Sequence, residues 1–196
     1  MDTHGCSTVI GHAGSERCEL DTFEDLIEAN DRHAATFDAG SLPAPPRRQL
    51  AVLTCMDCRI DEHEAFGIAA GDAHVLRNAG ARTSDDAIRS LIKSTHQLGV
   101  NRIAVIHHTD CGAAKIQRDD LRAKVRATTG HDPVEVDFQL IGDPDQTLLD
   151  DVERLRTSPY LPPGTLVGGF VYDVRTGRLD PRVIGRVGDA RGQAQA

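Results

Sequence analysis

Two short apolar runs, each followed by a cluster of metal-binding and ionisable residues, constrain the fold of this chain most strongly. The runs are residues 50–53 and 103–106, and both are rich in branched aliphatic side chains. Runs of this length and composition are typical of strands that are buried on both faces of a parallel sheet. Ligands of open parallel sheets bind beyond the carboxyl ends of such strands, so we expect a functional site there.

The residues that follow the two runs are those that bind zinc in proteins. The first run is followed by Cys55, Asp57, Cys58 and Arg59, and the second by His107, His108, Asp110 and Cys111. His108 and Cys111 lie on the turn that leaves a buried strand, and Cys55 at the end of a neighbouring strand can supply a third ligand. Three protein ligands leave one position open, which is typical of catalytic zinc. Two thiolates and an imidazole favour zinc over harder cations.

The second cysteine of the first cluster, Cys58, leaves two other interpretations open. Together with the three predicted ligands it would make a closed, four-ligand structural site, and the Cys55-x-x-Cys58 spacing is also that of a thiol redox pair. A sealed site has no need of the charged neighbours Asp57 and Arg59, and a redox pair does not explain the second cluster. We therefore favour an open catalytic zinc site, with a zinc-stabilised redox-sensing or binding module as the alternative.

Composition excludes several classes of protein. At 196 residues the chain is long enough for one domain with a substantial core. The formal net charge of −8 is spread along the chain, which argues against a nucleic-acid partner. No apolar run approaches the roughly 20 residues that span a bilayer, and residues 1–15 lack the apolar stretch of a secretory signal. We expect a cytoplasmic protein without a membrane partner.

The five cysteines, an odd number, favour metal or thiol chemistry over a disulfide framework.

Strands and helices are expected to alternate around the two clusters. The pattern predicts helices at residues 21–33, 84–98, 117–128 and 148–155, and further strands at residues 73–76 and 167–174. A strand followed by a helix and a parallel strand is the right-handed crossover unit of parallel sheets. The expected fold class is therefore α/β, with a central, mostly parallel β-sheet flanked by helices.

The chain is expected to consist of three segments. Residues 1–46 form an N-terminal arm with the helix at 21–33, ending in a stiff proline-rich connector. Residues 47–185 form the zinc-binding α/β catalytic domain, and residues 186–196, rich in Gly, Ala and Gln, are predicted to be disordered. The arm helix is too short to be stable alone, so we expect its apolar face to pack on the domain or on a partner subunit.

The paired motifs resemble those of the β-class carbonic anhydrases. Cys-x-Asp-x-Arg after one strand and His-x-x-Cys-Gly after a later one are similar to that family's motifs. The resemblance covers residues 50–115, including the Arg-Asn-Ala-Gly sequence between the motifs, and again residues 169–179. It implies the family's fold, an N-terminal helix that reaches over a partner subunit, and a homodimer or homotetramer.

The resemblance also implies a role for the residues of both motifs. The implied zinc ligands are Cys55, His108 and Cys111. Asp57 and Arg59 correspond to a catalytic dyad, and Gly112 to a residue that directs its backbone N–H at the bound substrate or bicarbonate. In some members the dyad aspartate moves onto the zinc ion, so Asp57 is also a candidate fourth ligand.

The expected activity is zinc-dependent, reversible hydration of carbon dioxide to bicarbonate and a proton by a zinc-bound hydroxide, the reaction of a carbonate dehydratase. Some proteins of the same family hydrolyse carbonyl sulfide or carbon disulfide, which are also linear and electrophilic at carbon. Two positions depart from the family pattern. Cys58 stands where a small residue is usual, and Ala113-Ala114 where a bulkier apolar residue is usual. The second departure alters the expected pocket wall.

Overall fold

The computed structural model describes residues 8–9, 17–18 and 23–189, and the chain divides into two compact units, Met1–Leu42 and Pro43–Ala196. The first unit contains a short antiparallel pair, β1 (Thr8–Val9) with β2 (Arg17–Cys18), and helix α1 (Glu24–Ala34). The helix buries none of its side chains. The N-cap residue Phe23 and the helix residues Leu26 and Ile27 are 76%, 61% and 61% exposed. The partner expected for this face stays a prediction.

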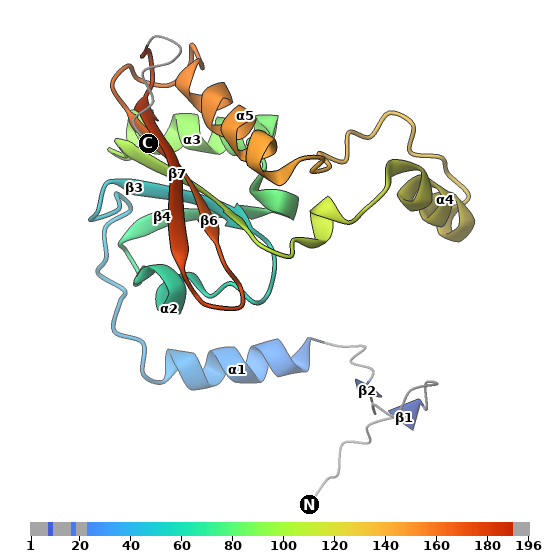
Figure 1. Cartoon of the computed structure of the whole chain (residues 1–196). Coiled ribbons are helices and arrows are strands. Elements are labelled where there is room, and N and C mark those ends of the chain that lie inside the picture. The colour runs from blue at the N-terminus through green and yellow to red at the C-terminus, as the bar shows by residue number, and fades with distance from the viewer. Residues whose placement is uncertain (1–7, 10–16, 19–22, 190–196) are drawn as a thin grey trace, which may run out of the picture. The chain divides into compact units, whose positions relative to one another are not determined.

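A five-stranded sheet forms the centre of the second unit (Figure 1). Its strands are β3 (Leu50–Cys55), β4 (Ala73–Asn78), β5 (Arg102–His108), β6 (Leu166–Tyr172) and β7 (Leu179–Arg186). Their order in the sheet is β4-β3-β5-β6-β7, and only the pairing of β6 with β7 is antiparallel. This arrangement confirms the expected α/β class with a mostly parallel sheet.

Helices flank the sheet on both sides (Figure 1). Helices α3 (Asp85–Gln97) and α5 (Pro144–Arg156) lie on one side and α2 (Glu62–Phe66) on the other, whereas α4 (Arg118–Thr129) stands away from the sheet and buries none of its residues. The 3-10 turns are η1 (Ala79–Ala81) and η2 (Gly112–Ala114). The sequence predicted α1, α3, α4 and α5 but missed α2, because five residues carry little periodicity. Within the described ranges, none of the helices is long and apolar enough to cross a lipid bilayer.

Helix α5 begins earlier than residue 148, where the sequence analysis placed its start. Asp143 caps the helix, since its side chain accepts a hydrogen bond from the backbone N–H of Gln146, and Pro144 occupies the first turn. Proline suits this position because its fixed φ is helical and it has no N–H to leave unpaired. The apolar periodicity starts only one turn later, which is why it marked the wrong residue.

The main hydrophobic core lies between the sheet and the helices α3 and α5. Leu91 of α3 and Leu148 and Val152 of α5 pack against Val105 and Val167 of the central strands. A second cluster on the other face contains Val52, Ile68 and Ile106. Neighbouring strand residues such as Val105 and Ile106 thus enter different cores, as expected for strands buried on both faces.

The folded domain continues past residue 185, where the sequence analysis placed its end. Strand β7 extends to Arg186, the side chain of Val187 is buried, and its N–H donates to the carbonyl of Thr165 at 2.9 Å. The polar, Gly-containing composition of this segment hid its pairing with β6. Residues 190–196 of the predicted disordered tail lie outside the described residues.

Strand β6 carries two adjacent glycines where α5 and β7 come close to its backbone. A Cβ atom at Gly169 would lie 2.8 Å from Cγ2 of Val152 and 2.9 Å from Cγ1 of Val183. Real Cβ contacts are longer, so the neighbouring side chains would have to move. Helix α5 therefore packs on bare backbone at this point.

We expect Gly169→Ala to lower the free energy of unfolding by about 1–3 kcal/mol, because the added methyl group overpacks the core. The measurement is urea unfolding followed by circular dichroism. Gly142→Ala is the matched control, since a Cβ at Gly142 meets nothing within 4 Å. Equal effects of the two substitutions would contradict the packing explanation.

Candidate metal centre

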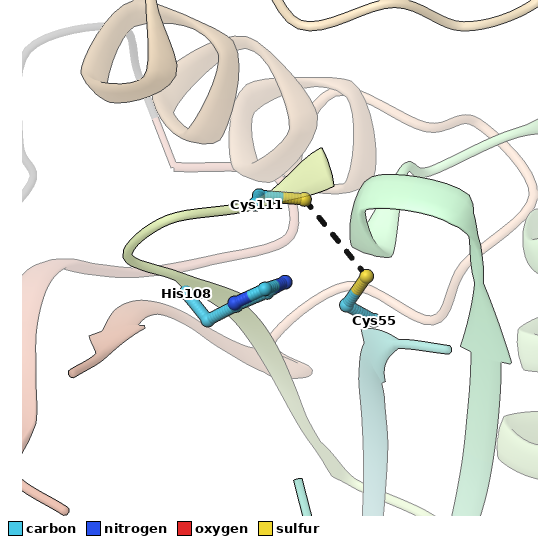
Figure 2. Close-up of side chains that lie close together, drawn as sticks. All are labelled: Cys55, His108 and Cys111. Carbon is cyan, nitrogen blue, oxygen red and sulfur yellow. Dashed lines mark hydrogen bonds between the residues drawn. The ribbon is translucent and has the colours of Figure 1, made fainter. Parts of the chain in front are cut away.

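The carboxyl ends of β3 and β5 bring the three predicted metal ligands together. Thr54 is paired with Ile106 in the parallel register, so the residues that follow them leave the sheet at the same edge. Figure 2 shows Cys55, His108 and Cys111 around one point. Their ligand atoms all lie within 4.8 Å of one another, and all three residues are buried. Among the described residues, this group of side chains is placed to hold a metal ion.

The imidazole of His108 is oriented for metal binding. Its Nδ1 donates a hydrogen bond to the carbonyl oxygen of Thr109 at 2.9 Å, which leaves a lone pair on Nε2. Nε2 is buried and has no hydrogen-bond partner within the described part of the chain. Histidine ligands of metals commonly donate their second ring N–H to a carbonyl in this way. The unpartnered nitrogen therefore fits a metal ligand.

The two ligand sulfurs interact with each other and with a backbone N–H. Sγ of Cys55 lies 4.0 Å from Sγ of Cys111 and accepts a hydrogen bond from the N–H of Gly80 at 3.4 Å. The hydrogen bond from Cys111 lowers the pKa of Cys55 to about 3 although burial opposes the shift, and the same interaction raises the pKa of Cys111. The sulfur of Cys55 is thus the one that loses its proton more readily. Both sulfurs would have to be deprotonated to bind zinc, so Cys111 would give up its proton on metal binding.

Asp57 and Arg59 form a doubly hydrogen-bonded pair next to the ligands. Nε of Arg59 donates to Oδ1 of Asp57 at 2.9 Å, and Nη2 donates to Oδ2 at 2.7 Å. Oδ2 in turn lies 3.8 Å from Nε2 of His108. The hydrogen bonds from Arg59 hold the pKa of Asp57 well below its usual range. The site therefore presents an ionised, oriented carboxylate beside the unpartnered imidazole nitrogen.

Asp110 holds the guanidinium of Arg59 from its other side. Its Oδ2 accepts from Nη1 at 2.9 Å and its carbonyl oxygen accepts from Nη2 at 3.1 Å, while Lys115 pairs with Oδ1. Asp110 has a positive φ of 58°, a left-handed conformation that Asp tolerates better than most residues. The sequence analysis placed Asp110 in the cluster without this role. Its place between two ligands was the only signal.

Arg77, at the end of β4, braces the loop that carries the first cluster. Its Nε donates to the carbonyl of Cys55 at 3.0 Å and its Nη2 to the carbonyl of Asp57 at 2.7 Å. Its third nitrogen, Nη1, donates to Glu62 of α2 at 2.8 Å. The backbone on both sides of residue 56 is therefore anchored to a neighbouring strand.

The remaining predicted residues lie around the ligands in different ways. Gly112 follows the ligand Cys111 and opens η2, so its backbone is next to the cluster. Cys58 is exposed and does not belong to the group of described side chains that can share a metal ion. A closed site with Cys58 as the fourth ligand therefore has no support. Ala113 and Ala114 are half-buried.

The ligand cysteines lie in an apolar surround. Cys55 and Cys111 pack in one cluster with Ile60, Ala81 and Ile141, against which Phe66, Ala113, Ala114 and Tyr172 are partly buried. The rings of Phe66 and Tyr172 meet edge to face, with their centroids 5.5 Å apart. Such a surround excludes water from the ligand sulfurs and suits a small, nonpolar molecule.

Comparison with known proteins identifies the family. The sequence model of the family described as carbonic anhydrase matches residues 50–133. β-Carbonic anhydrase 1 of Mycobacterium tuberculosis is 37% identical over 157 residues, which are 80% of this chain and 95% of that protein. The chain belongs to the β-carbonic anhydrase family. The recognition from the paired motifs is thereby confirmed.

Members of the β-carbonic anhydrase family similar to this chain carry two different names. The crystal structure of the carbonic anhydrase of Streptococcus mutans has a TM-score of 0.78 and 37% identity, and the match covers 83% of this chain and 98% of that one. The carbon disulfide hydrolase of an Acidianus species is 36% identical over an alignment of 159 positions, and the match covers 69% of this chain and 78% of that protein. Family membership alone therefore leaves the substrate open.

Substitution of the cysteines separates an open site from a four-sulfur or redox arrangement. We expect Cys58→Ser to retain the zinc content of the parent protein, because Cys58 lies outside the ligand group, and Cys111→Ser to lose most of it. Elemental analysis of the purified proteins after dialysis against a weak chelator gives the zinc per chain. Equal zinc loss in both variants would contradict the three-ligand site.

Proposed function

We propose that this protein catalyses the zinc-dependent, reversible hydration of carbon dioxide to bicarbonate and a proton. One observation carries the proposal. The ionised carboxylate of Asp57 accepts a hydrogen bond from Arg59, and its Oδ2 lies 3.8 Å from Nε2 of His108. A structural zinc site has no use for an oriented acceptor at this place. Membership of the β-carbonic anhydrase family supports the same conclusion.

The donor set fits a zinc ion. Cys55, His108 and Cys111 offer two sulfurs and one unpartnered nitrogen in a buried group, and these are the ligand types that zinc prefers. When bound, zinc supplies acidity, because it lowers the pKa of a coordinated water toward about 7. Three ligands from the chain are the number typical of catalytic zinc.

Asp57 accepts a hydrogen bond from the water that attacks carbon and thereby orients it. Because Arg59 contacts both carboxylate oxygens, Asp57 can neither rotate freely nor take up a proton easily. The backbone N–H of Gly112 is the proposed donor to the oxygen that becomes negative as bicarbonate forms. The apolar surround holds the linear substrate without competing polar contacts.

Asp57 is also the proposed fourth ligand of a closed, inactive form. Its Oδ2 lies 3.8 Å from the ligand atom of His108, so a small movement would bring it to the metal. That movement gives up the 2.7 Å hydrogen bond from Nη2 of Arg59. Since Arg59 is itself held by Asp110, the hydrogen-bond pattern favours the open form.

The second candidate is hydrolysis of carbon disulfide or carbonyl sulfide by the same residues. It is favoured by the similarity to carbon disulfide hydrolases and by the small side chains at Ala113 and Ala114 beside the ligand Cys111. Sulfur is larger than oxygen, so a wall of alanines suits these substrates sterically.

Parallel assays of the zinc-loaded protein distinguish the two reactions. Stopped-flow detection of proton release measures hydration of carbon dioxide, and a colorimetric sulfide assay measures hydrolysis of carbon disulfide and carbonyl sulfide. We expect rapid proton release from carbon dioxide. Sulfide release without measurable hydration of carbon dioxide would overturn the first proposal in favour of the second.

Asp57→Ala tests the proposed acceptor. We expect the variant to keep its zinc and to lose about 10²–10⁴-fold in turnover, because the attacking water loses its oriented partner. Asp86→Ala removes an exposed carboxylate from α3, where it pairs with Arg89, and serves as the control with unchanged turnover. A zinc-loaded Asp57→Ala protein with the turnover of the parent would exclude the assigned role.

We further propose a cytoplasmic homodimer or homotetramer that binds neither nucleic acid nor membranes. The exposed apolar face of α1, formed by Phe23, Leu26 and Ile27, supports association with a second copy of the chain. The net charge of −8 disfavours binding to phosphate backbones. Light scattering after size-exclusion chromatography measures the number of chains in the assembly.

A further inference from the structure

A second cluster of charged side chains lies behind the strand end that carries His108. His107 precedes this ligand on β5, and because successive strand residues face opposite sides, its ring points toward α5. There its Nε2 lies 3.3 Å from Oδ2 of Asp151. The side chains of His107 and Asp151 are only 5% and 4% exposed. The activity proposed above does not use this buried pair.

Asp151 accepts hydrogen bonds from the loop that follows β4. The backbone N–H and the hydroxyl of Thr83 donate to Oδ1 at 3.0 and 2.6 Å, and Nε of Arg82 donates to Oδ2 at 2.7 Å. Burial acts to raise the pKa of Asp151, but the contacts with His107, Thr83 and Arg82 bring it below its usual value. Asp151 is therefore an ionised carboxylate within an apolar layer.

The loop held by Asp151 also contacts a ligand sulfur. Arg82 and Thr83 directly follow η1, in which Gly80 donates its N–H to Sγ of Cys55. A Cβ atom at Gly80 would lie 3.0 Å from Ile141, so this turn has little room to move. A displacement of Arg82 or Thr83 would therefore also displace Gly80, two or three residues earlier, and change its hydrogen bond to Sγ of Cys55.

Arg82 extends the same network to the segment that covers the ligands. Its Nη1 donates to the carbonyl oxygens of Gln139 and Leu140 at 2.9 and 3.0 Å. The next residue, Ile141, packs in the cluster that contains Cys55 and Cys111. The network therefore reaches the surroundings of all three ligands, through His107 on β5, through η1, and through Ile141.

Stability alone does not account for such a network. Burying a charge pair costs solvation, and replacing it with apolar residues is often neutral or stabilising. In the same layer α5 buries the apolar side chains of Leu148, Val152 and Leu155 against the sheet. A purely apolar residue at position 151 would fill this layer but would leave β5, η1 and the segment before α5 without a common anchor.

We propose that Asp151 is a positioning residue of the metal centre, which sets the spacing of the ligand atoms through His107, Arg82 and Thr83. The inference rests on the proposed metal-binding role of Cys55, His108 and Cys111, and it is independent of the substrate. The contacts to Arg82 and Thr83 are aligned hydrogen bonds. The contact to His107 is close but not aligned as a hydrogen bond, so the loop provides the stronger connection.

The test compares Asp151→Asn with Asp150→Asn, which changes an exposed carboxylate one residue away on α5. Transfer of zinc from the loaded protein to a chromophoric chelator gives the rate of metal release. The visible spectrum of the cobalt-substituted protein reports ligand geometry through its d–d and sulfur-to-metal bands. We expect Asp151→Asn to release zinc about 10–100-fold faster, the usual effect of losing a residue that orients ligands, and to shift the cobalt bands. Asp150→Asn is expected to do neither.

Thr83→Val and Thr83→Ser provide a second pair of variants in case Asp151→Asn does not fold. Valine keeps the shape of Thr83 and its backbone N–H but removes the hydroxyl that donates to Asp151 at 2.6 Å, whereas serine keeps a hydroxyl there. We expect faster zinc release from Thr83→Val and restoration of the parent rate in Thr83→Ser.

Three outcomes separate this inference from the function on which it rests. Folded Asp151→Asn and Thr83→Val proteins with the parent's release rate and cobalt spectrum would overturn the positioning role, even if they unfold at a lower temperature. A parent protein that binds no zinc would overturn the metal site itself. A normal zinc centre in a protein that does not hydrate carbon dioxide would overturn only the proposed substrate.

Discussion

The parallel pairing of β3 with β5 is the constraint on which the rest of the site depends. It places the ends of two strands at one edge of the sheet, so that Cys55 and His108 meet although they are far apart in the chain. A slip of one residue in this register would turn His108 toward α5 and His107 toward the sulfurs, because successive side chains face opposite sides. The apolar cores on both faces oppose such a slip, since they would have to exchange Val105 for Ile106.

Two ionised carboxylates flank the ligands, and each is controlled by an arginine. Asp57 lies on the ligand side with Arg59, and Asp151 lies behind β5 with Arg82. Their surroundings differ in exposure, since Asp151 is almost fully buried whereas Asp57 is reachable from solvent. The partly exposed carboxylate of Asp57 is suited to exchange a hydrogen bond with a reactant. The buried one is suited to hold backbone in place, because nothing competes for its oxygens.

In either proposed reaction, the apolar wall rather than the charged groups would select the substrate. Hydration of carbon dioxide and hydrolysis of carbon disulfide both need a nucleophilic water and an oriented acceptor, and the same residues are proposed to supply them in both cases. The two linear molecules differ mainly in the size of their terminal atoms. Discrimination therefore falls to side chains such as Phe66, Ala113 and Tyr172, whose placement depends on packing. This is why membership of the family supports a common set of site residues but does not choose between the two reactions.

The amino-acid sequence by itself determined the family, the α/β class and four of the helices, and it predicted the candidate ligand set and the Asp57–Arg59 pair. These depend on local patterns and on motifs of adjacent residues. Only the tertiary structure decided which groups hold those residues in place. Asp110 meets Arg59 across 51 positions of the chain, and Asp151 meets Arg82 across 69. Tertiary structure also separated Cys58 from the ligands, although its spacing from Cys55 would permit a shared metal. Hydrogen-bond partners that the fold brings together leave no periodic signal in a sequence. Any of the 30 acidic residues is chemically able to bind a given arginine, and only the fold selects one.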